Sequence, residues 1–241
     1  MPKKIALVTG ATRGIGLETV RQLAKNDIHV ILAGRDAAKA EESAKKLRDE
    51  KLDVESIALD VTDEKSVATA VHSIEKRHGH LDILINNAGV LLDDQKKKPS
   101  EQSMETWRTT FDTNVFGLVE TTVAFLPLIR KSSAGRIVNV SSGLGSITMH
   151  ADPSSAIYNY KIVAYDVSKS AVNAWTVHLA WELKDTAIKV NTIHPGSVKT
   201  DMNSAGSLDV EEGAKSSVEL ALIGSDGPNG TFSHLGKPLP W

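Results

Sequence analysis

A tyrosine and a lysine lie four residues apart in the stretch YDVSK, residues 165–169. If this stretch is helical, Tyr165 and Lys169 share one face, because residues i and i+4 are neighbours on a helix surface. A free phenol has a pKa of about 10, too high for ready proton exchange at neutral pH, and a nearby ammonium group lowers it. The pair is therefore a candidate proton donor with an electrostatic helper. An ordinary exposed tyrosine and lysine would have the same spacing, so the rest of the chain must decide.

A glycine-rich segment, TGATRGIG at residues 9–16, follows an apolar run and leads into an amphipathic stretch. Gly10 permits a tight turn off a strand, Gly14 lets the backbone approach a pyrophosphate, and Gly16 lets the following helix pack closely. The first turn of that helix offers free N–H groups and a partial positive charge to phosphate oxygens. The segment predicts a dinucleotide site, and a strand–helix turn without a ligand is the alternative.

The end of the second apolar run, ILAGRD at residues 31–36, bears on which dinucleotide binds. An acid at this strand end would bind the ribose diol of NAD. Asp36 precedes a helical stretch, and aspartate is a favoured N-cap, so we interpret it as a cap. Gly34 then leaves room, and Arg35 and Arg13 offer two cations to a 2′-phosphate, which arginine binds in a bidentate manner. We therefore expect NADP(H), with two unrelated surface arginines as the alternative.

The elements that must position these groups alternate along the chain. Short runs rich in β-branched residues predict buried strands, and the stretches between them have helical periodicity. This alternation predicts a doubly wound, Rossmann-type parallel sheet of about seven strands with helices on both faces, a three-layer αβα arrangement, in a single domain over 1–241. Strands are expected at 5–9, 29–34, 54–59, 81–86, 136–140 and 188–193, and helices at 15–26, 37–51, 62–77 (with Thr62 as N-cap), 103–130 and 165–183.

Composition excludes several classes of protein. The chain has 241 residues and no cysteine, so disulfides, thiolate catalysis and cysteine-based metal sites are excluded. A net charge of −2 gives no nucleic-acid signal, and the apolar run at the N-terminus is too short for a signal peptide or a membrane span. We expect a cytoplasmic protein without nucleic-acid or membrane partners. HGH at 78–80 should end a helix, and no carboxylate cluster completes a site there, so no metal is expected.

Six motifs occur in a fixed order: TGATRGIG, NNAG at 86–89, Asn114, IVNVSSG at 137–143, YDVSK, and HPGSVKTDM at 194–202. Together they resemble the single-domain branch of the short-chain dehydrogenase/reductase family over nearly the whole chain. Within that family, the C-terminal tail and the region before Tyr165 resemble the carbonyl-reductase-like members.

The resemblance implies catalytic roles. Tyr165 would be the general acid in carbonyl reduction, and Lys169 would lower its pKa and bind the nicotinamide ribose. Ser142, rather than Ser141, would hydrogen-bond the substrate oxygen. Asn114 would shape a water-linked proton relay to the lysine.

The resemblance also implies an NADPH/NADP+ site at the carboxyl ends of the strands. Asp60 and Val61 would contact the adenine, although Asp60 could instead cap the helix that follows. The full set of expected cofactor-binding residues is Gly10, Thr12, Arg13, Gly14, Ile15, Gly16, Arg35, Asp60, Val61, Asn87, Ala88, Gly89, Tyr165, Lys169, Pro195, Gly196, Val198 and Thr200.

The implied activity is the reversible, NADPH-dependent reduction of a ketone or aldehyde to an alcohol. The substrate would be a small carbonyl compound, with an apolar or aromatic one favoured. A 3-oxoacyl-thioester reductase, which uses the same catalytic groups, and a non-catalytic NADP-binding regulator are the alternatives. The chain would be a monomer or a homo-oligomer, with a dimer favoured over a tetramer.

Three segments remain to be placed. Ser142 and Tyr165 lie 23 residues apart, roughly twice the usual family spacing. We expect 143–161 to wall the substrate site, to present Tyr158 or Tyr160 to the substrate and to hinder tetramer assembly; an inert insertion is the alternative. Segment 200–213 would be a substrate-side lid or an ordinary crossover loop. Segment 91–102, which contains three consecutive lysines, predicts a solvated surface loop.

Overall fold

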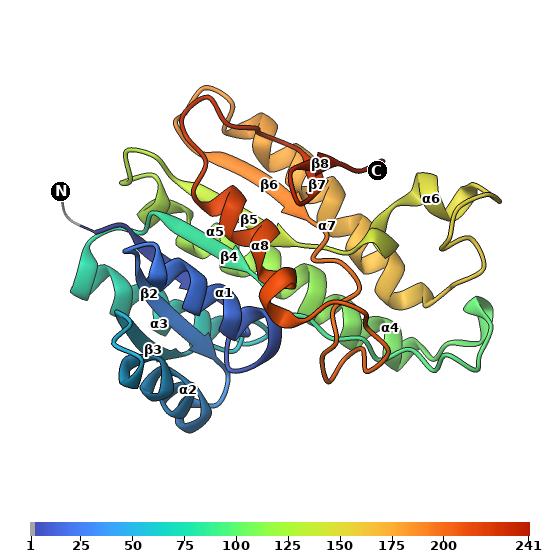
Figure 1. Ribbon diagram of the computed structural model, residues 1–241, viewed down its shortest axis with the longest axis horizontal. Coiled ribbons are helices and arrows are strands. Elements are labelled where there is room, and N and C mark those ends of the chain that lie inside the picture. Colours follow the sequence, from blue (N-terminus) through green and yellow to red (C-terminus); the bar gives the residue numbers. More distant parts are fainter. Residues whose placement is uncertain (1–2) are drawn as a thin grey trace.

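The computed structural model describes residues 3–241 and is built around one sheet of eight strands, in the order β3-β2-β1-β4-β5-β6-β7-β8 (Figure 1). β1 pairs in parallel with both β2 and β4, so the direction of winding reverses between β1 and β4. Every other pair is parallel except β7 with β8. The predicted doubly wound α/β fold is confirmed.

All six predicted strands are present, within two residues of their expected ends. The two additional strands are short and lie at the far edge of the sheet. They have three and two residues, which is too few for a readable alternation of apolar and polar residues. The strands are β1 (Ile5–Val8), β2 (His29–Gly34), β3 (Val54–Ala58), β4 (Ile83–Asn86), β5 (Arg136–Val140), β6 (Lys189–Ile193), β7 (Phe232–His234) and β8 (Lys237–Pro238).

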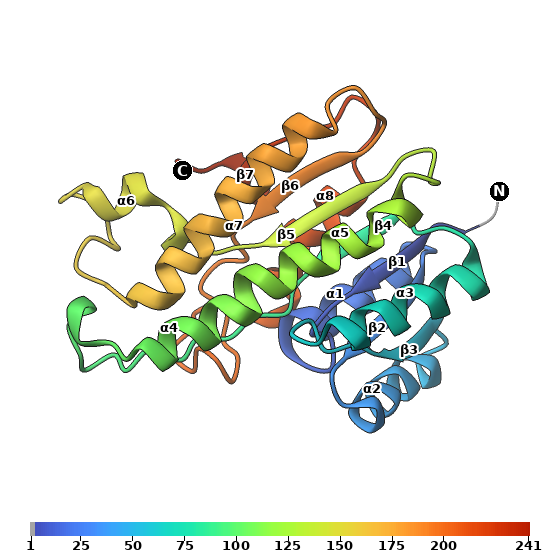
Figure 2. The same ribbon diagram turned by 180° about the vertical axis from the view of Figure 1, so that it is seen from behind.

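Helices cover both faces of the sheet, as Figures 1 and 2 show from opposite sides. Successive residues of a strand point to opposite faces, so Ala6 and Val8 pack in one apolar core while Ile5 and Leu7 pack in the other. The first core includes residues of α1 (Gly14–Lys25), α2 (Ala37–Asp49) and α8 (Val210–Ala221), and the second includes residues of α3 (Glu64–His78), α5 (Gly117–Ile129) and α7 (Val163–Glu182).

Two helix boundaries differ from the prediction. The N-cap of α3 is Asp63, whose side chain accepts a hydrogen bond from the N–H of Lys65, and not Thr62. Thr62 instead donates to Asp60. The single helix expected at 103–130 is α4 (Met104–Phe111), a π-helical turn, η2 (Asp112–Phe116), and then α5. Asp36 caps α2 as predicted, accepting from the N–H groups of Ala38 and Lys39.

The two segments expected as loops, 91–102 and 200–213, and the insertion 143–161 all contain helical residues. Segment 91–102 includes η1 (Pro99–Glu101), and segment 143–161 includes η3 (Gly143–Gly145) and α6 (Ile147–Ala151). The last four residues of 200–213 belong to α8. Among the helices of the described chain, none is long and apolar enough to cross a membrane.

Candidate active site

The glycine segment turns sharply off β1 and runs straight into α1. Gly10 and Gly14 have φ angles of +61° and +58°, a region that favours glycine. A Cβ at Gly10 would lie 2.7 Å from Cα of Ala88, whereas a Cβ at Gly14 would meet only a methyl of Thr200 at 3.8 Å. The N-cap of α1, Arg13, makes no side-chain cap. The open space at Gly14 and the uncapped helix start fit a pyrophosphate.

The NNAG loop after β4 is tied to the glycine segment. The hydroxyl of Thr9 accepts hydrogen bonds from the N–H groups of Asn87 and Ala88. The Asn87 amide donates to the backbone carbonyls of Thr9 and Gly10. A Cβ at Gly16 would collide with the Asn87 amide, so α1 packs against this loop as closely as a glycine allows. The two predicted cofactor segments therefore form one unit at the switch point of the sheet.

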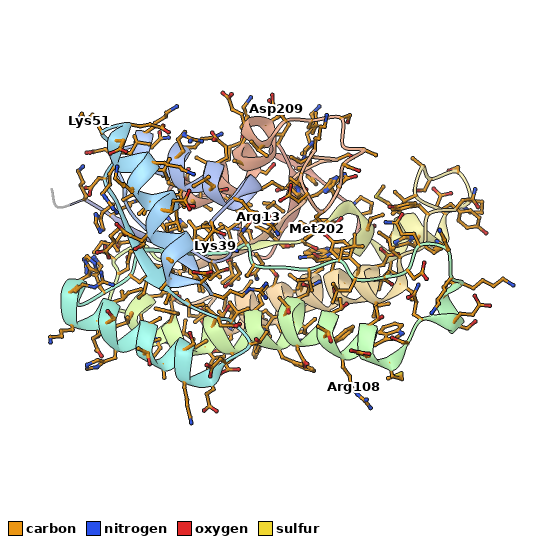
Figure 3. All side chains as sticks on the ribbon, turned by 90° about the horizontal axis from the view of Figure 1, so that it is seen from below. Arg13, Lys39, Lys51, Arg108, Met202 and Asp209 are labelled. Atoms are coloured by element: carbon orange, nitrogen blue, oxygen red, sulfur yellow. The ribbon has the colours of Figure 1, made fainter. Side chains whose placement is uncertain are left out.

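Three exposed cations lie along the glycine segment, directly after β2 and in the first turn of α2. Arg13 is exposed and pairs with Asp201 at 2.7 Å, which links the glycine segment to the loop before α8. Arg35 is exposed directly after β2, and Lys39, in the first turn of α2, is a further cation that the sequence pattern did not single out. Figure 3 labels Arg13 and Lys39 on one side of the molecule.

One prediction about this corner was wrong. A Cβ at Gly34 would collide with the Thr12 methyl, so that space is filled by protein and is not left for a phosphate.

The remaining expected cofactor residues follow β3 and β6. Asp60 accepts from the N–H and hydroxyl of Thr62, and so closes a local turn rather than capping α3. The Val61 carbonyl faces Gly117, where a Cβ would lie 2.6 Å from it. The last group follows β6 in the chain. Pro195 is half-buried, and Gly196 has a φ angle of +92°. Val198 is buried against Gly213, and Thr200 faces Gly14.

Tyr165 and Lys169 lie on one face of α7, with Nζ of Lys169 5.5 Å from the centroid of the tyrosine ring. The ammonium donates to the carbonyl of Val140, the last residue of β5, at 2.8 Å. Burial lowers the pKa of Lys169 to about 8. Burial also raises the pKa of Tyr165 to about 12, against the opposing hydrogen-bond influence of Ser142. In this structure desolvation sets the direction of the tyrosine shift, and the lowering expected from Lys169 stays a prediction.

Asn114 lies in the π-helical turn between α4 and α5 and is fully buried. Its Oδ1 accepts from the N–H of Val90 at 2.8 Å, and its Nδ2 donates to the carbonyl of Val90 and to the hydroxyl of Ser168. Gly89 lies between the two groups: a Cβ there would be 3.3 Å from Oδ1 of Asn114 and 3.5 Å from Nζ of Lys169. The structure thus brings Asn114 next to Lys169. A π-helical turn often marks a functional position.

The two serines after β5 point in different directions. The hydroxyl of Ser141 is buried and donates to the carbonyl of Lys169. The hydroxyl of Ser142 caps η3 by accepting a hydrogen bond from the N–H of Leu144. A hydrogen bond between Ser142 and Tyr165 works to lower the pKa of the tyrosine. Ser142 therefore lies at Tyr165, while Ser141 supports the backbone of α7.

Asp93 is a site residue for which the pattern contains no signal, because it stands in a run of charged residues that predicts a solvated loop. It is buried, and its carboxylate accepts hydrogen bonds from the N–H groups of Ala164 and Tyr165 at 2.8 and 3.1 Å. The positive end of the helix dipole also stabilises a carboxylate at this position. Asp93 therefore caps α7 at the residue that carries the candidate acid.

The segment before α7 packs against the same helix start. Nε2 of His150 lies 2.9 Å from the carbonyl of Leu144 and 3.4 Å from a carboxylate oxygen of Asp166. Tyr160 is near enough to influence the pKa of Tyr165, and its side chain is partly exposed. Burial raises the pKa of Asp166 to about 7, and the Asp93 carboxylate adds to the rise. Segment 143–161 thus borders the candidate acid.

Known proteins share this chain's sequence pattern and fold. The family model for short chain dehydrogenases matches residues 4–210. Short-chain dehydrogenase anuI of Penicillium roqueforti is 38% identical over 97% of this chain and 93% of its own length. The (+)-neomenthol dehydrogenase of Capsicum annuum is 31% identical over 95% of this chain and 95% of its own length. The crystal structure of an NADPH-bound carbonyl reductase from chicken fatty liver superposes with a TM-score of 0.86 at 28% identity and covers 100% of both chains. This chain belongs to the short-chain dehydrogenase/reductase family of oxidoreductases.

Proposed function

We propose that this protein is an NADP(H)-dependent carbonyl reductase that converts a ketone or aldehyde to an alcohol and can run in reverse. The observation that carries the proposal is the meeting of Tyr165, Lys169, Ser142 and Asn114 at the carboxyl ends of β4 and β5. The names of two similar proteins, a neomenthol dehydrogenase and a carbonyl reductase with NADPH bound, support the same chemistry.

Each of these side chains has a distinct task in the proposal. NADPH, when bound, supplies the hydride. The hydroxyls of Ser142 and Tyr165 hold the carbonyl oxygen, and Tyr165 gives it a proton as charge develops there. The phenol of Tyr165 holds its proton at neutral pH, because burial raises its pKa to about 12. Lys169 and Asn114 form the route by which that proton is replaced from solvent.

The proposed cofactor site consists of the residues expected from the family resemblance, from Gly10 to Thr200, together with Lys39. Arg13, Arg35 and Lys39 would surround the 2′-phosphate, and Arg13 would exchange its partner Asp201 for that phosphate. The NADPH- and NADP-bound solved relatives support this preference.

Cofactor preference is tested with Arg35→Ala. Loss of a charged contact to the 2′-phosphate should lower kcat/KM for NADPH by at least about tenfold and leave the value for NADH within about twofold. Arg108→Ala, an exposed arginine on α4, is the matched control (Figure 3). Equal kcat/KM values for NADPH and NADH in the wild type, or an unchanged NADPH value in Arg35→Ala, would refute the NADP(H) preference.

The substrate is proposed to be a small, apolar or aromatic carbonyl compound. Segments 143–161 and 200–213 are proposed as the substrate side of the site, and the partly exposed rings of Tyr158 and Tyr160 offer apolar surface. The decisive experiment follows NADPH oxidation at 340 nm with a panel of apolar ketones, aldehydes and a 3-oxoacyl thioester. Turnover of apolar ketones above that of the thioester supports the proposal. The reverse ranking would make the chain a 3-oxoacyl-thioester reductase. No turnover of any carbonyl compound would favour the non-catalytic NADP-binding regulator.

The assembly is proposed to be a monomer or dimer. Segment 143–161 lies at the start of α7 and would stand in the way of a helix-mediated tetramer. A stable tetramer by light scattering would overturn this part of the proposal.

A further inference from the structure

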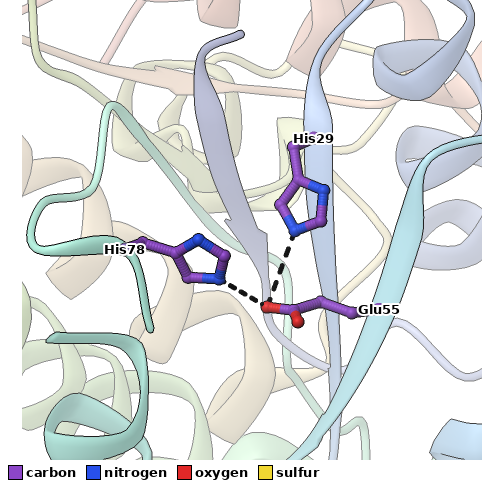
Figure 4. Close-up of side chains that lie close together, drawn as sticks. All are labelled: His29, Glu55 and His78. Carbon is purple, nitrogen blue, oxygen red and sulfur yellow. Dashed lines mark hydrogen bonds and ion pairs between the residues drawn. The ribbon is translucent and has the colours of Figure 1, made fainter. Parts of the chain in front are cut away.

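Three side chains that are distant in sequence meet at the end of the sheet away from the candidate active site. His29 opens β2, Glu55 lies in β3 and His78 ends α3 (Figure 4). Nε2 of His78 is 2.8 Å from Oε1 of Glu55, and Nε2 of His29 is 3.6 Å from the same oxygen. One ligand atom from each residue lies within 4.8 Å of the others. Two imidazoles and one carboxylate are a donor set that binds zinc in proteins.

The imidazole of His29 is held in the orientation of a metal ligand. Its Nδ1 lies 2.8 Å from a carboxylate oxygen of Asp53. Its Nε2 is buried and has no hydrogen-bond partner among the described residues, since 3.6 Å to Glu55 is too long for one. A histidine that binds a metal through one nitrogen typically bonds a carboxylate through the other. The unpaired nitrogen, directed at Glu55, is the observation that points to a cation-binding site.

We propose that His29, Glu55 and His78 bind one Zn²⁺ ion, through Nε2 of each histidine and Oε1 of Glu55. Ligand atoms about 2.0 Å from a tetrahedral zinc lie about 3.3 Å apart, close to the observed 2.8 and 3.6 Å. The guanidinium of Arg77 holds the other carboxylate oxygen at 2.6 Å, so Glu55 binds the ion through a single oxygen. Water completes the coordination, because all three side chains are partly exposed. Mg²⁺ and Ca²⁺, which prefer oxygen ligands, fit this site poorly.

The ion has a structural task. β3 is an edge strand, and the site joins it to β2 and to the last residue of α3. His29 lies at the opposite end of β2 from Gly34, about 17 Å away at the usual rise per strand residue. Zinc here should therefore stabilise the edge of the fold and leave the candidate reaction unaffected.

The test uses the full-length chain without an affinity tag, stripped of metal with EDTA and returned to chelator-free buffer. Calorimetric titration with ZnCl₂ should give one ion per chain. His78→Gln and Glu55→Gln should each weaken that binding by at least about tenfold, because each removes one of three protein ligands. His72→Gln is the matched control, since His72 is exposed on the same helix and lies outside the cluster. It should bind as the wild type does.

A second readout is thermal unfolding. Zinc should raise the Tm of the wild type and of His72→Gln, but not that of His78→Gln, because an ion that binds only the folded chain stabilises it. If His78→Gln does not fold, Glu55→Gln decides. The proposal is overturned if the wild type shows no saturable binding, or if both ligand variants bind zinc as tightly as the wild type. Equal weakening in His72→Gln would also overturn it.

Discussion

At Tyr165 and Lys169 burial shifts the pKa values of two neighbouring groups in opposite directions. It raises the pKa of the phenol to about 12, which makes it a weaker acid than a free phenol, and it lowers the pKa of the ammonium to about 8, so the lysine exchanges protons near neutral pH. The four-residue spacing correctly indicated that the two share a helix face. It could not reveal the sign of the tyrosine shift, because desolvation depends on the side chains and strands packed around α7.

The pKa of Lys169 gives a prediction for pH dependence. Below about pH 8 the lysine of the free enzyme is an ammonium ion, and above it the lysine is neutral. If the charge is needed, kcat/KM for NADPH, which reports groups of the free enzyme, should be flat from pH 6.5 to 7.5 and about tenfold lower at pH 9. Initial rates at saturating carbonyl substrate measure this. A value that stays constant up to pH 9.5 would mean that the charge of Lys169 is dispensable.

At the scale of elements, the strands and most helices were predictable because each carries its own periodicity. The π-helical turn at Asn114 was not, since it depends on the fit of the asparagine amide to Val90 and Ser168. The cap of α7 was also hidden: α7 takes its capping carboxylate from Asp93, more than 70 residues upstream. A local capping pattern cannot report a cap supplied from a distant loop.

Asp93→Ala tests whether that cap positions Tyr165. The variant loses two hydrogen bonds to backbone N–H groups and a favourable charge at the helix start, so its free energy of unfolding should fall by about 1–2 kcal/mol. Its kcat should fall while its KM for NADPH changes little, because the displaced residue is the acid. Urea unfolding and steady-state kinetics give both numbers. Asp94→Ala, an exposed neighbour, should behave like the wild type, and an equally active Asp93→Ala would remove Asp93 from the site.

For the whole molecule, the switch in strand order between β1 and β4 explains why segments from the beginning, middle and end of the chain meet at one edge. This architecture was predictable from the order of strands and helices. The meeting of His29, Glu55 and His78 was not, because the HGH motif shows only one of its three ligands and the other two arrive through β2 and β3. Sequence order predicts which elements pair, but not which side chains touch between them.

The raised pKa of Asp166 should make the free energy of unfolding depend on pH. The folded chain keeps this proton up to about pH 7, whereas an unfolded aspartate loses it near pH 4, so the folded state binds more protons in between. This group therefore makes the folded chain less stable as the pH rises from 4 to 7. Asp166→Asn, which cannot ionise, should gain about 2 kcal/mol relative to the wild type between pH 5 and pH 8, somewhat less than the full shift implies. Urea unfolding of both proteins at the two pH values measures the difference; the same difference at both would show that Asp166 ionises normally.

The central claim, that the hydroxyl of Tyr165 delivers the proton and is not required for cofactor binding, is tested most directly by Tyr165→Phe. The substitution removes one hydroxyl and keeps the ring, so NADPH should bind with a Kd within about threefold of the wild-type value. Carbonyl reduction, followed as NADPH oxidation at 340 nm, should fall by at least about a thousandfold. Retained turnover in Tyr165→Phe, or lost turnover accompanied by lost NADPH binding, would contradict the role given to Tyr165.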